Sequence, residues 1–339
     1  MWTLLKLLFA LPLLTVRVLW RRLRGATPAR WTFLFALANE ALRWTITGLL
    51  ARLIAGHFKQ PPMPRLRGRL AKQTQQRQAT LAGCPAEWHL PRASPEGPCI
   101  LYLHGGGFVT GSVGTHRRLM ARLAVAAKAR VVGIDYRLAP AHPFPAGLDD
   151  CVAAYRALLD SGEAPGRLFI GGDSAGGGLT VSTLLRLKAE GLPMPAGALA
   201  LSPAVDLADL RSSWEENAPF DFLAPLRDHA LALLPAYLGP EGDPSWPLVS
   251  PINADLSGLP PLLLHVGSRE VLRDQVVAFA ERAKQAGVPV ALEVVADMVH
   301  VFHAFFDVQP DAEAAIERLG AFVQATAAGP VAQQSVQRA

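Results

Sequence analysis

The sequence predicts an α/β fold with a mostly parallel central sheet and helices on both of its faces. Two observations lead to this fold class. The chain has 339 residues, half of them apolar, which is enough for one large domain with a cover. From about residue 85 onward, short apolar runs alternate with longer helical stretches. This alternation is typical of a parallel sheet whose connecting helices cover both faces.

The first 30 residues are a basic and apolar leader. A largely apolar run without charged side chains over residues 7–16 is too short to cross a bilayer by itself. At about 100° per residue, four cations fall on one face of a helix; these are Lys6, Arg17, Arg21 and Arg24. Residues 1–80 carry a net charge of +13 and the remaining residues −8. This asymmetry predicts that the N-terminal section faces an anionic partner.

Residues 31–58 predict a second helical stretch. Most of its side chains are apolar, and polar ones line one side; these are Asn39, Glu40, Arg43 and Thr47. Prolines then end the helix, at Pro61, Pro62 and Pro64. Residues 65–80 are basic and rich in glutamine, so we expect a surface helix or a linker there.

The central sheet is expected from six short apolar runs, at residues 100–103, 131–135, 167–171, 198–202, 262–266 and 290–295. Helices are expected between and after them, at residues 115–128, 148–160, 175–190, 272–286 and 311–326. Residues 206–248 interrupt this rhythm with several prolines and aromatic residues. We expect this segment to be an insertion that lies over the sheet, and residues 331–339 to be a flexible tail.

The segment Gly172–Gly176 matches the G-x-S-x-G pattern of a nucleophilic serine. It follows a predicted strand and begins a predicted helix, which is the context that the pattern requires. A sharp turn there exposes the hydroxyl of Ser174, and the helix N-terminus places positive partial charge beside a developing oxyanion. The alternative is a glycine-rich turn with Ser174 as a helix cap.

A second glycine-rich segment, His104–Gly107, directly follows the first predicted strand of the series. Glycines let backbone N–H groups turn toward a tetrahedral oxyanion without a Cβ in the way. We therefore expect an oxyanion hole from Gly105, Gly106 and Gly107, with a further donor from Ala175. His104 is expected to brace this loop. A phosphate site is disfavoured, because the chain lacks both nucleotide-binding glycine patterns.

The general base is expected among three histidines that follow Ser174 in the chain, namely His265, His300 and His303. His265 lies inside a predicted strand and is expected to be packed, and His303 is expected on a helix surface. His300 follows the last predicted strand and is preferred. The acid should follow the strand at 262–266, where Glu270 is nearer to the strand end and Asp274 is the alternative.

Together these residues resemble the bacterial hormone-sensitive-lipase family of α/β-hydrolase-fold esterases. The resemblance covers roughly residues 81–326 and also rests on Asp135–Pro140 and Met298–His300. It implies that Ser174 is the nucleophile and His300 the base. It also implies a helical cap built from residues 31–80 and 206–248 over a catalytic domain at 81–330. The acid loop departs from the family's usual Asp-Pro-Leu-x-Asp, since it begins with Glu270.

The resemblance implies a serine carboxylesterase that acts on short- to medium-chain acyl esters of small molecules. An amidase, a deacetylase, a lactonase or a non-catalytic binding protein would use the same scaffold. No cofactor, metal or nucleic-acid partner is expected, and the sequence leaves open whether the chain forms a homo-oligomer. The three cysteines have no C-x-x-C spacing and are expected to be buried hydrophobic residues; they are Cys84, Cys99 and Cys151.

For the leader, we expect a cytoplasmic enzyme held at the inner membrane face by residues 1–30. The apolar run would enter the headgroup boundary while the flanking cations reach anionic lipid. Two alternatives stay open, a signal anchor that crosses the bilayer and a leader helix that packs on the cap.

Overall fold

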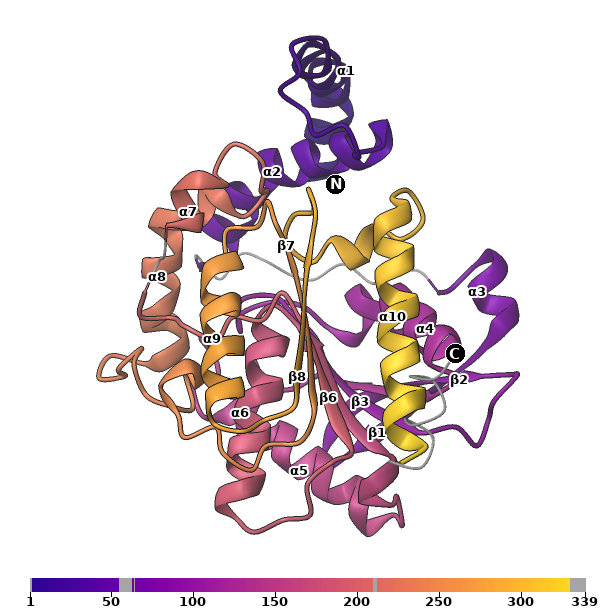
Figure 1. Cartoon of the computed structure of the whole chain (residues 1–339). Helices are drawn as coiled ribbons and strands as arrows, with labels where there is room; N and C mark the ends of the chain where they lie inside the picture. The colour runs from indigo at the N-terminus through magenta and orange to yellow at the C-terminus, as the bar shows by residue number, and fades with distance from the viewer. Residues whose placement is uncertain (1, 55–62, 64, 210–211, 330–339) are drawn as a thin grey trace.

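The computed structural model describes residues 2–54, 63, 65–209 and 212–329. The expected tail at 331–339 lies outside these residues. One eight-stranded sheet runs in the order β1-β2-β4-β3-β5-β6-β7-β8 (Figure 1). Its strands are β1 (Thr74–Leu81), β2 (Cys84–Pro91), β3 (Cys99–Leu103), β4 (Arg130–Ile134), β5 (Leu168–Asp173), β6 (Gly197–Leu201), β7 (Leu262–Gly267) and β8 (Val290–Val295). β2 is antiparallel to β1 and to β4, and all other neighbours are parallel.

Helices cover both faces of the sheet, because successive strand side chains point to opposite faces. Leu101 and Leu103 of β3 belong to one apolar cluster, while Ile100 and Tyr102 belong to the other. Figure 1 shows two layers of helices, one on each side of the sheet. The first layer contains α5 (Ala146–Asp160), α6 (Ala175–Ala189) and α9 (Arg273–Gln285), and the second contains α4 (Val113–Ala127) and α10 (Pro310–Ala327).

The predicted α/β fold is confirmed, and the six predicted strands and five predicted helices from residue 100 onward are present. Their ends agree with the structure to within two residues. The buried strands are easy to recognise because both faces are covered, which makes them continuous apolar runs.

The prediction of a surface helix or linker at residues 65–80 is wrong for residues 74–80, which form a strand. A short helix, α3 (Gly68–Gln73), leads into β1, which forms an antiparallel hairpin with β2 at the edge of the sheet. The glutamines, which have no apolar alternation and so gave no strand pattern in the sequence, bind a residue of the neighbouring strand. Gln76 and Gln78 donate hydrogen bonds to the buried carboxylate of Glu87 on β2 at 2.8 and 2.5 Å. An edge strand needs no apolar alternation when its polar side chains find such partners.

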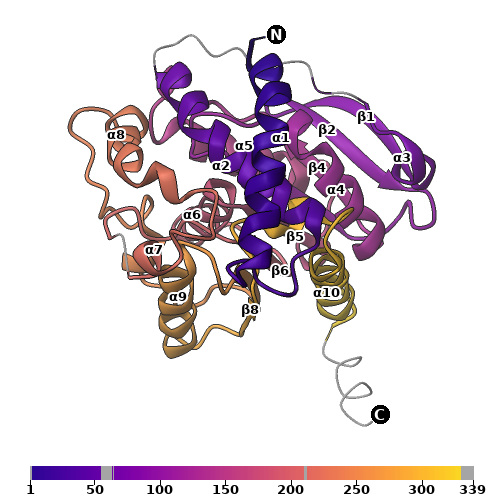
Figure 2. The same cartoon turned by 90° about the horizontal axis from the view of Figure 1, so that it is seen from above.

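The two N-terminal helices and the mid-chain insertion pack against each other above the sheet. α1 (Trp2–Leu23) lies across α2 (Phe33–Ile54), as Figure 2 shows, and buries Leu14 and Val18. α2 in turn contacts α8 (Arg227–Leu238) of the insertion, which also contains α7 (Ser213–Glu216). Within the described parts of the chain, no helix is long and apolar enough to cross a membrane.

Candidate active site

Ser174 lies at the turn between β5 and α6. Its backbone has a φ of 53° and a ψ of −122°, a conformation that side-chain-bearing residues rarely adopt. Helix α6 begins so close to β3 that a Cβ on Gly176 would lie 2.0 Å from the carbonyl oxygen of Leu103. Only glycine allows this approach, and the approach places the loop after β3 beside Ser174.

Three of the residues expected to carry the chemistry lie within hydrogen-bonding distance in a row. The Nε2 atom of His300 lies 2.8 Å from Oγ of Ser174, and its Nδ1 atom lies 2.8 Å from Oε1 of Glu270. Each of these residues follows the carboxyl end of a parallel strand: Ser174 follows β5, Glu270 follows β7 and His300 follows β8. Parallel strands bring such ends to one edge of a sheet, which is how residues 126 positions apart meet.

Ser202 is a further part of this arrangement that the sequence analysis missed. Its hydroxyl donates to Oε2 of Glu270 at 2.9 Å and accepts a bond from the amide of Val301 at 3.0 Å. The amide of Gly267 also donates to Oε2 of Glu270, at 2.9 Å. Ser202 therefore links the acid to the residue that follows His300. The one sequence feature that could have indicated Ser202 is its position directly after β6, the strand next to β5, which precedes Ser174.

The pKa of His300 is raised above its ordinary value. Burial of the ring alone would lower this pKa, but the charge of Glu270 and its hydrogen bond to the ring outweigh burial, and Asp221 contributes in the same direction. An opposite charge next to an imidazole stabilises the imidazolium. His300 is therefore a stronger base than an ordinary histidine.

The side chain of Asp173 holds the loop His104–Gly107 in place through hydrogen bonds. Oδ1 of Asp173 accepts hydrogen bonds from the hydroxyl of Tyr102 at 2.7 Å and the amide of Gly105 at 3.2 Å. A Cβ on Gly105 would lie 2.3 Å from Oδ2 of the same carboxylate. Gly105 was expected among the oxyanion donors, but its amide N–H donates to Asp173 instead. This leaves the other expected donors, those of Gly106, Gly107 and Ala175.

A pair of stacked histidines, the buried His104 and the half-buried His116, stabilises the same loop. His116 of α4 lies with Nε2 3.2 Å from Oδ2 of Asp173, and its ring stacks on that of His104. Burial would raise the pKa of Asp173, but the charge of His116 and the hydrogen bonds from His116 and Tyr102 lower it to about 2. Asp173 is therefore a carboxylate at neutral pH. His104 has a pKa lowered to about 3, chiefly by burial, and braces the loop as a neutral ring.

The remaining candidates lie apart from this row. His265 and His303 are both fully buried and form a pair, with 3.1 Å between Nδ1 of the first and Nε2 of the second. The expectation that His303 lies on a helix surface is wrong, because the side chain is fully buried and its ring stacks on that of His265 in β7. Oδ2 of Asp274 accepts from the hydroxyl of Ser212 and the amide of Ser213, each at 2.8 Å, and not from His300.

The three cysteines, Cys84, Cys99 and Cys151, are buried and unpaired. Burial raises the pKa of Cys84 to about 11 and that of Cys99 to about 12. Within the described residues, no group of three or more side chains is arranged to hold a metal ion.

The mid-chain insertion holds the loop that carries Glu270. The side-chain amide of Asn217 donates to the carbonyl oxygen of Glu270 at 2.8 Å. Oδ2 of Asp221 accepts from the amide of Val271 at 2.9 Å, and the hydroxyl of Ser213 donates to the carbonyl oxygen of Val271 at 2.8 Å. We call residues 213–221 the clamp segment. Its contacts were not foreseen, because they join two loops with no sequence pattern in common.

Asp221 and Phe222 bring the insertion up to His300 itself. Asp221 is fully buried, and burial, with the nearby charge of Glu270, raises its pKa to about 6 despite the opposing effect of His300. The ring of Phe222 lies 6.0 Å from that of His300. The insertion therefore forms one wall of the site.

Comparison with known proteins agrees with this geometry. A family model described as the alpha/beta hydrolase fold matches residues 100–304. An acetyl-hydrolase from Streptomyces hygroscopicus is 44% identical over 250 residues, which cover 74% of this chain and 82% of that protein. An esterase from Acinetobacter venetianus is 39% identical over 223 residues, which cover 66% and 73% of the two chains.

Two solved structures are similar over most of their length. A crystal structure of an esterase from the bacterial hormone-sensitive lipase family superposes with a TM-score of 0.73 at 39% identity, covering 92% of this chain and 96% of the other. An esterase crystal soaked with p-nitrophenyl butyrate gives a TM-score of 0.73 at 40% identity, covering 84% and 99%.

Proposed function

Because the chain belongs to the hormone-sensitive-lipase family of α/β-hydrolase-fold esterases, and is thus an ester-hydrolysing enzyme, we propose that it acts through an acyl-enzyme on Ser174. The observation that carries this proposal is the row Ser174, His300 and Glu270, with 2.8 Å at each of its two contacts. The substrates that we propose are small esters with short- to medium-chain acyl groups. A relative named an acetyl-hydrolase and a neighbour soaked with a butyrate ester support this range.

The proposed reaction has two halves. His300 takes the proton of the Ser174 hydroxyl while Oγ attacks the ester carbonyl carbon. The amides of Gly106, Gly107 and Ala175 donate to the oxyanion that forms. His300 then gives its proton to the departing alcohol, and the same residues activate a water molecule that releases the carboxylic acid. Hydrolysis of nitrophenyl esters of increasing acyl length by the purified protein tests the activity and the range together.

The wall formed by Phe222 gives a prediction about chain length. We expect Phe222→Ala to move the preferred acyl chain toward longer esters, because the ring beside His300 restricts the space for the acyl group. Phe220→Ala is the matched control, since the Phe220 ring packs under the guanidinium of Arg269 at 4.5 Å. The ratio of kcat/KM for octanoate and butyrate esters measures the shift. Equal ratios in wild type and Phe222→Ala would show that the ring does not limit the acyl site.

The raised pKa of His300 gives a prediction about pH. The base must be neutral to accept the serine proton, so activity is lost as the pH falls through the pKa of His300. Since Glu270 raises this pKa, the acid limb of kcat/KM should have its midpoint above 6.5, the ordinary histidine value. Asp221→Asn, which removes a second nearby carboxylate, should move the midpoint downward. A midpoint at or below 6.5 in the wild type would contradict the assigned environment of His300.

We further propose that residues 1–30 hold the enzyme at an anionic, cytoplasmic membrane face. α1 packs on α2 through Leu14 and Val18, yet its outer side is strongly apolar and exposed. Leu13, Val16 and Leu23 are 74, 63 and 87% exposed. A helix of this kind can place its apolar side in the headgroup boundary of a bilayer. The side chain of Lys6 lies outside the described residues.

The test of this tether leaves the packed side of α1 intact. A variant with Leu13→Ser, Val16→Ser and Leu23→Ser should bind vesicles rich in phosphatidylglycerol at least about tenfold more weakly, since each change removes on the order of 1 kcal/mol of apolar burial. Sedimentation with vesicles measures binding, and hydrolysis of a nitrophenyl ester checks that the variant is folded. If the wild type stays in the supernatant, or the variant sediments equally well, the leader is only a packing element.

A further inference from the structure

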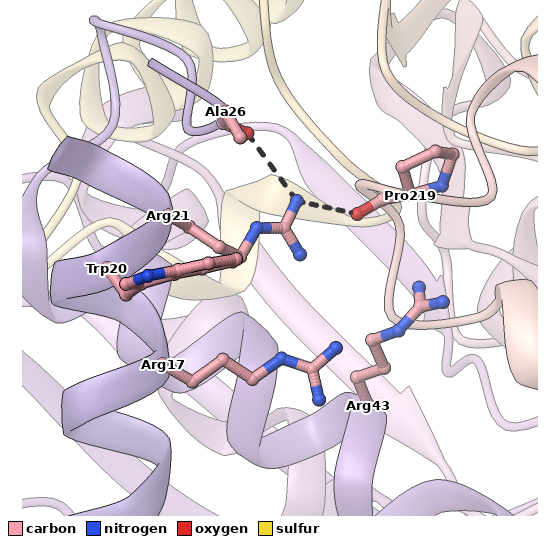
Figure 3. A pocket seen from close by; sticks show the side chains of 6 residues that line it. All are labelled: Arg17, Trp20, Arg21, Ala26, Arg43 and Pro219. Atoms are coloured by element: carbon pink, nitrogen blue, oxygen red, sulfur yellow. Dashed lines mark hydrogen bonds between the residues drawn. The ribbon is translucent and has the colours of Figure 1, made fainter. Parts of the chain in front are cut away.

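A pocket of about 380 Å³ lies between the two N-terminal helices and the clamp segment, and three arginines line it (Figure 3). Arg17 and Arg21 come from α1, and Arg43 comes from α2. The other lining residues are Trp20, Ala26 and Pro219. Figure 3 shows the three guanidinium groups directed toward a common space between the elements. The active site described above uses none of these side chains.

Positive charge exceeds negative charge around this pocket. Glu40 pairs with the two arginines that α1 contributes to the pocket, at 3.5 Å from Nε of Arg17 and 2.8 Å from Nη1 of Arg21. Arg43 instead donates Nη1 to the carbonyl oxygens of Ala218 and Asp221, at 2.7 and 2.8 Å. Burial first, and then the charges of Arg17 and Arg21, lower the pKa of Arg43, while Glu40 and Asp221 raise it. One further anion would relieve this repulsion.

The surface next to the pocket identifies the kind of anion. With about 100° per residue, and apart from Leu11, the exposed large apolar side chains among residues 10–23 of α1 form one continuous arc, whose members are Leu19, Leu23, Val16, Trp20 and Leu13. Arg17 and Arg21 follow at the edge of this arc, before the buried seam of Leu14 and Val18. Trp20 belongs both to the apolar arc and to the pocket, and it is 52% exposed. An anion bound here lies directly beside surface suited to hydrocarbon.

We propose that this pocket binds the phosphodiester group of an anionic membrane phospholipid. The proposal deepens the membrane association proposed above and rests on it. Guanidinium groups bind phosphate through two parallel N–H···O bonds, which a point charge does not reproduce. The volume is sufficient for a headgroup, and the arc of α1 would meet the acyl chains of the same leaflet.

Arg17 is the residue with which to test the pocket. Arg21 and Arg43 also hold the clamp segment, since Arg21 donates to the carbonyl oxygen of Pro219 at 2.9 Å, so their loss would disturb the enzyme. The Arg17 side chain is 58% exposed and has Glu40 as its ion-pair partner. Arg24 is its matched control. It is exposed and lies on the same segment, and its guanidinium stacks on Trp20 at 3.8 Å without lining the pocket.

The experiment compares the charge-conserving variants Arg17→Lys and Arg24→Lys by sedimentation with vesicles of phosphatidylglycerol in phosphatidylcholine. Arg17→Lys should bind about tenfold more weakly, the loss of one charge-assisted hydrogen bond. Arg24→Lys should bind as the wild type does. If neither variant changes binding, the basic surface acts only through its charge, and the pocket is overturned while the tether stands. If the wild type does not bind these vesicles, both proposals fail.

Two further arms separate lipid from free phosphate. Glycerol 1-phosphate at millimolar concentration should not raise the thermal unfolding midpoint, whereas phosphatidylglycerol vesicles should raise it for the wild type and less so for Arg17→Lys. A rise with glycerol 1-phosphate that Arg17→Lys abolishes, without a rise on vesicles, would assign the pocket to a free phosphate ester and overturn the lipid assignment. Hydrolysis of a nitrophenyl ester in the absence of vesicles should be the same for both variants.

Discussion

Ser174→Ala is expected to lower kcat for a nitrophenyl ester by about 10⁴-fold or more, while the protein stays folded. In the proposed mechanism the hydroxyl oxygen becomes acylated, and His300, whose Nε2 atom lies 2.8 Å away, is the proton acceptor assigned to it. Burst kinetics with the wild type should show an acyl-enzyme that the variant cannot form. The thermal unfolding midpoint of the variant should remain close to that of the wild type.

A serine on the same helix gives the control. Ser182 of α6 is buried and donates to the carbonyl oxygen of Leu248 at 2.9 Å, and none of its hydrogen bonds reaches His300 or Glu270. Ser182→Ala should therefore keep most of the activity even if its midpoint falls slightly. Near-normal hydrolysis by folded Ser174→Ala would remove Ser174 from the mechanism.

Glu270→Gln should be almost as damaging, with a loss in kcat on the order of 10⁴-fold. The amide of Gly267 can only donate, and it points at Oε2 of Glu270. A glutamine would satisfy this donor with its oxygen and turn its NH₂ group toward Nδ1 of His300. The ring would then carry its proton on Nε2, facing Ser174, which is the wrong tautomer for a base. The pH midpoint of any residual activity should also fall, because the carboxylate that raises the pKa of His300 is gone.

Asp274→Asn is the matched comparison, since it changes the other acid of the same loop. Asp274 accepts hydrogen bonds from Ser212 and Ser213, and these bonds attach the insertion to the first turn of α9. We expect less than about a tenfold loss in kcat for this variant. A greater loss for Asp274→Asn than for Glu270→Gln, with both proteins folded, would reverse the roles given to the two acids.

The sequence alone was sufficient to predict those parts of the fold in which consecutive residues are all buried. The inner parallel strands β3, β5, β6 and β7 are covered on both faces, so their apolar runs could be recognised one by one. The edge strand β1 could not be recognised in this way. Its glutamines satisfy a buried glutamate on β2, and that partner becomes visible only when the hairpin is formed.

The same distinction holds for the active site. Ser174, His300 and Glu270 each follow a strand, and the order of elements along the chain was enough to propose them. Ser202 and Asp221 act through contacts with loops that are 50 to 99 residues away in the sequence. The use of the Gly105 amide by Asp173 likewise depends on the close approach of two strands, which no local pattern encodes.

The clamp segment has a consequence for engineering. Because Asn217 and Asp221 bind the carbonyl and the N–H of the peptide group that follows Glu270, the insertion cannot be exchanged between esterases as an independent module. In a chimera that receives a foreign insertion without these two contacts, Glu270 would lose its alignment with His300, whatever the new substrate preference. Crossover points placed after Phe222 would keep the relay intact and leave α8 free for recombination.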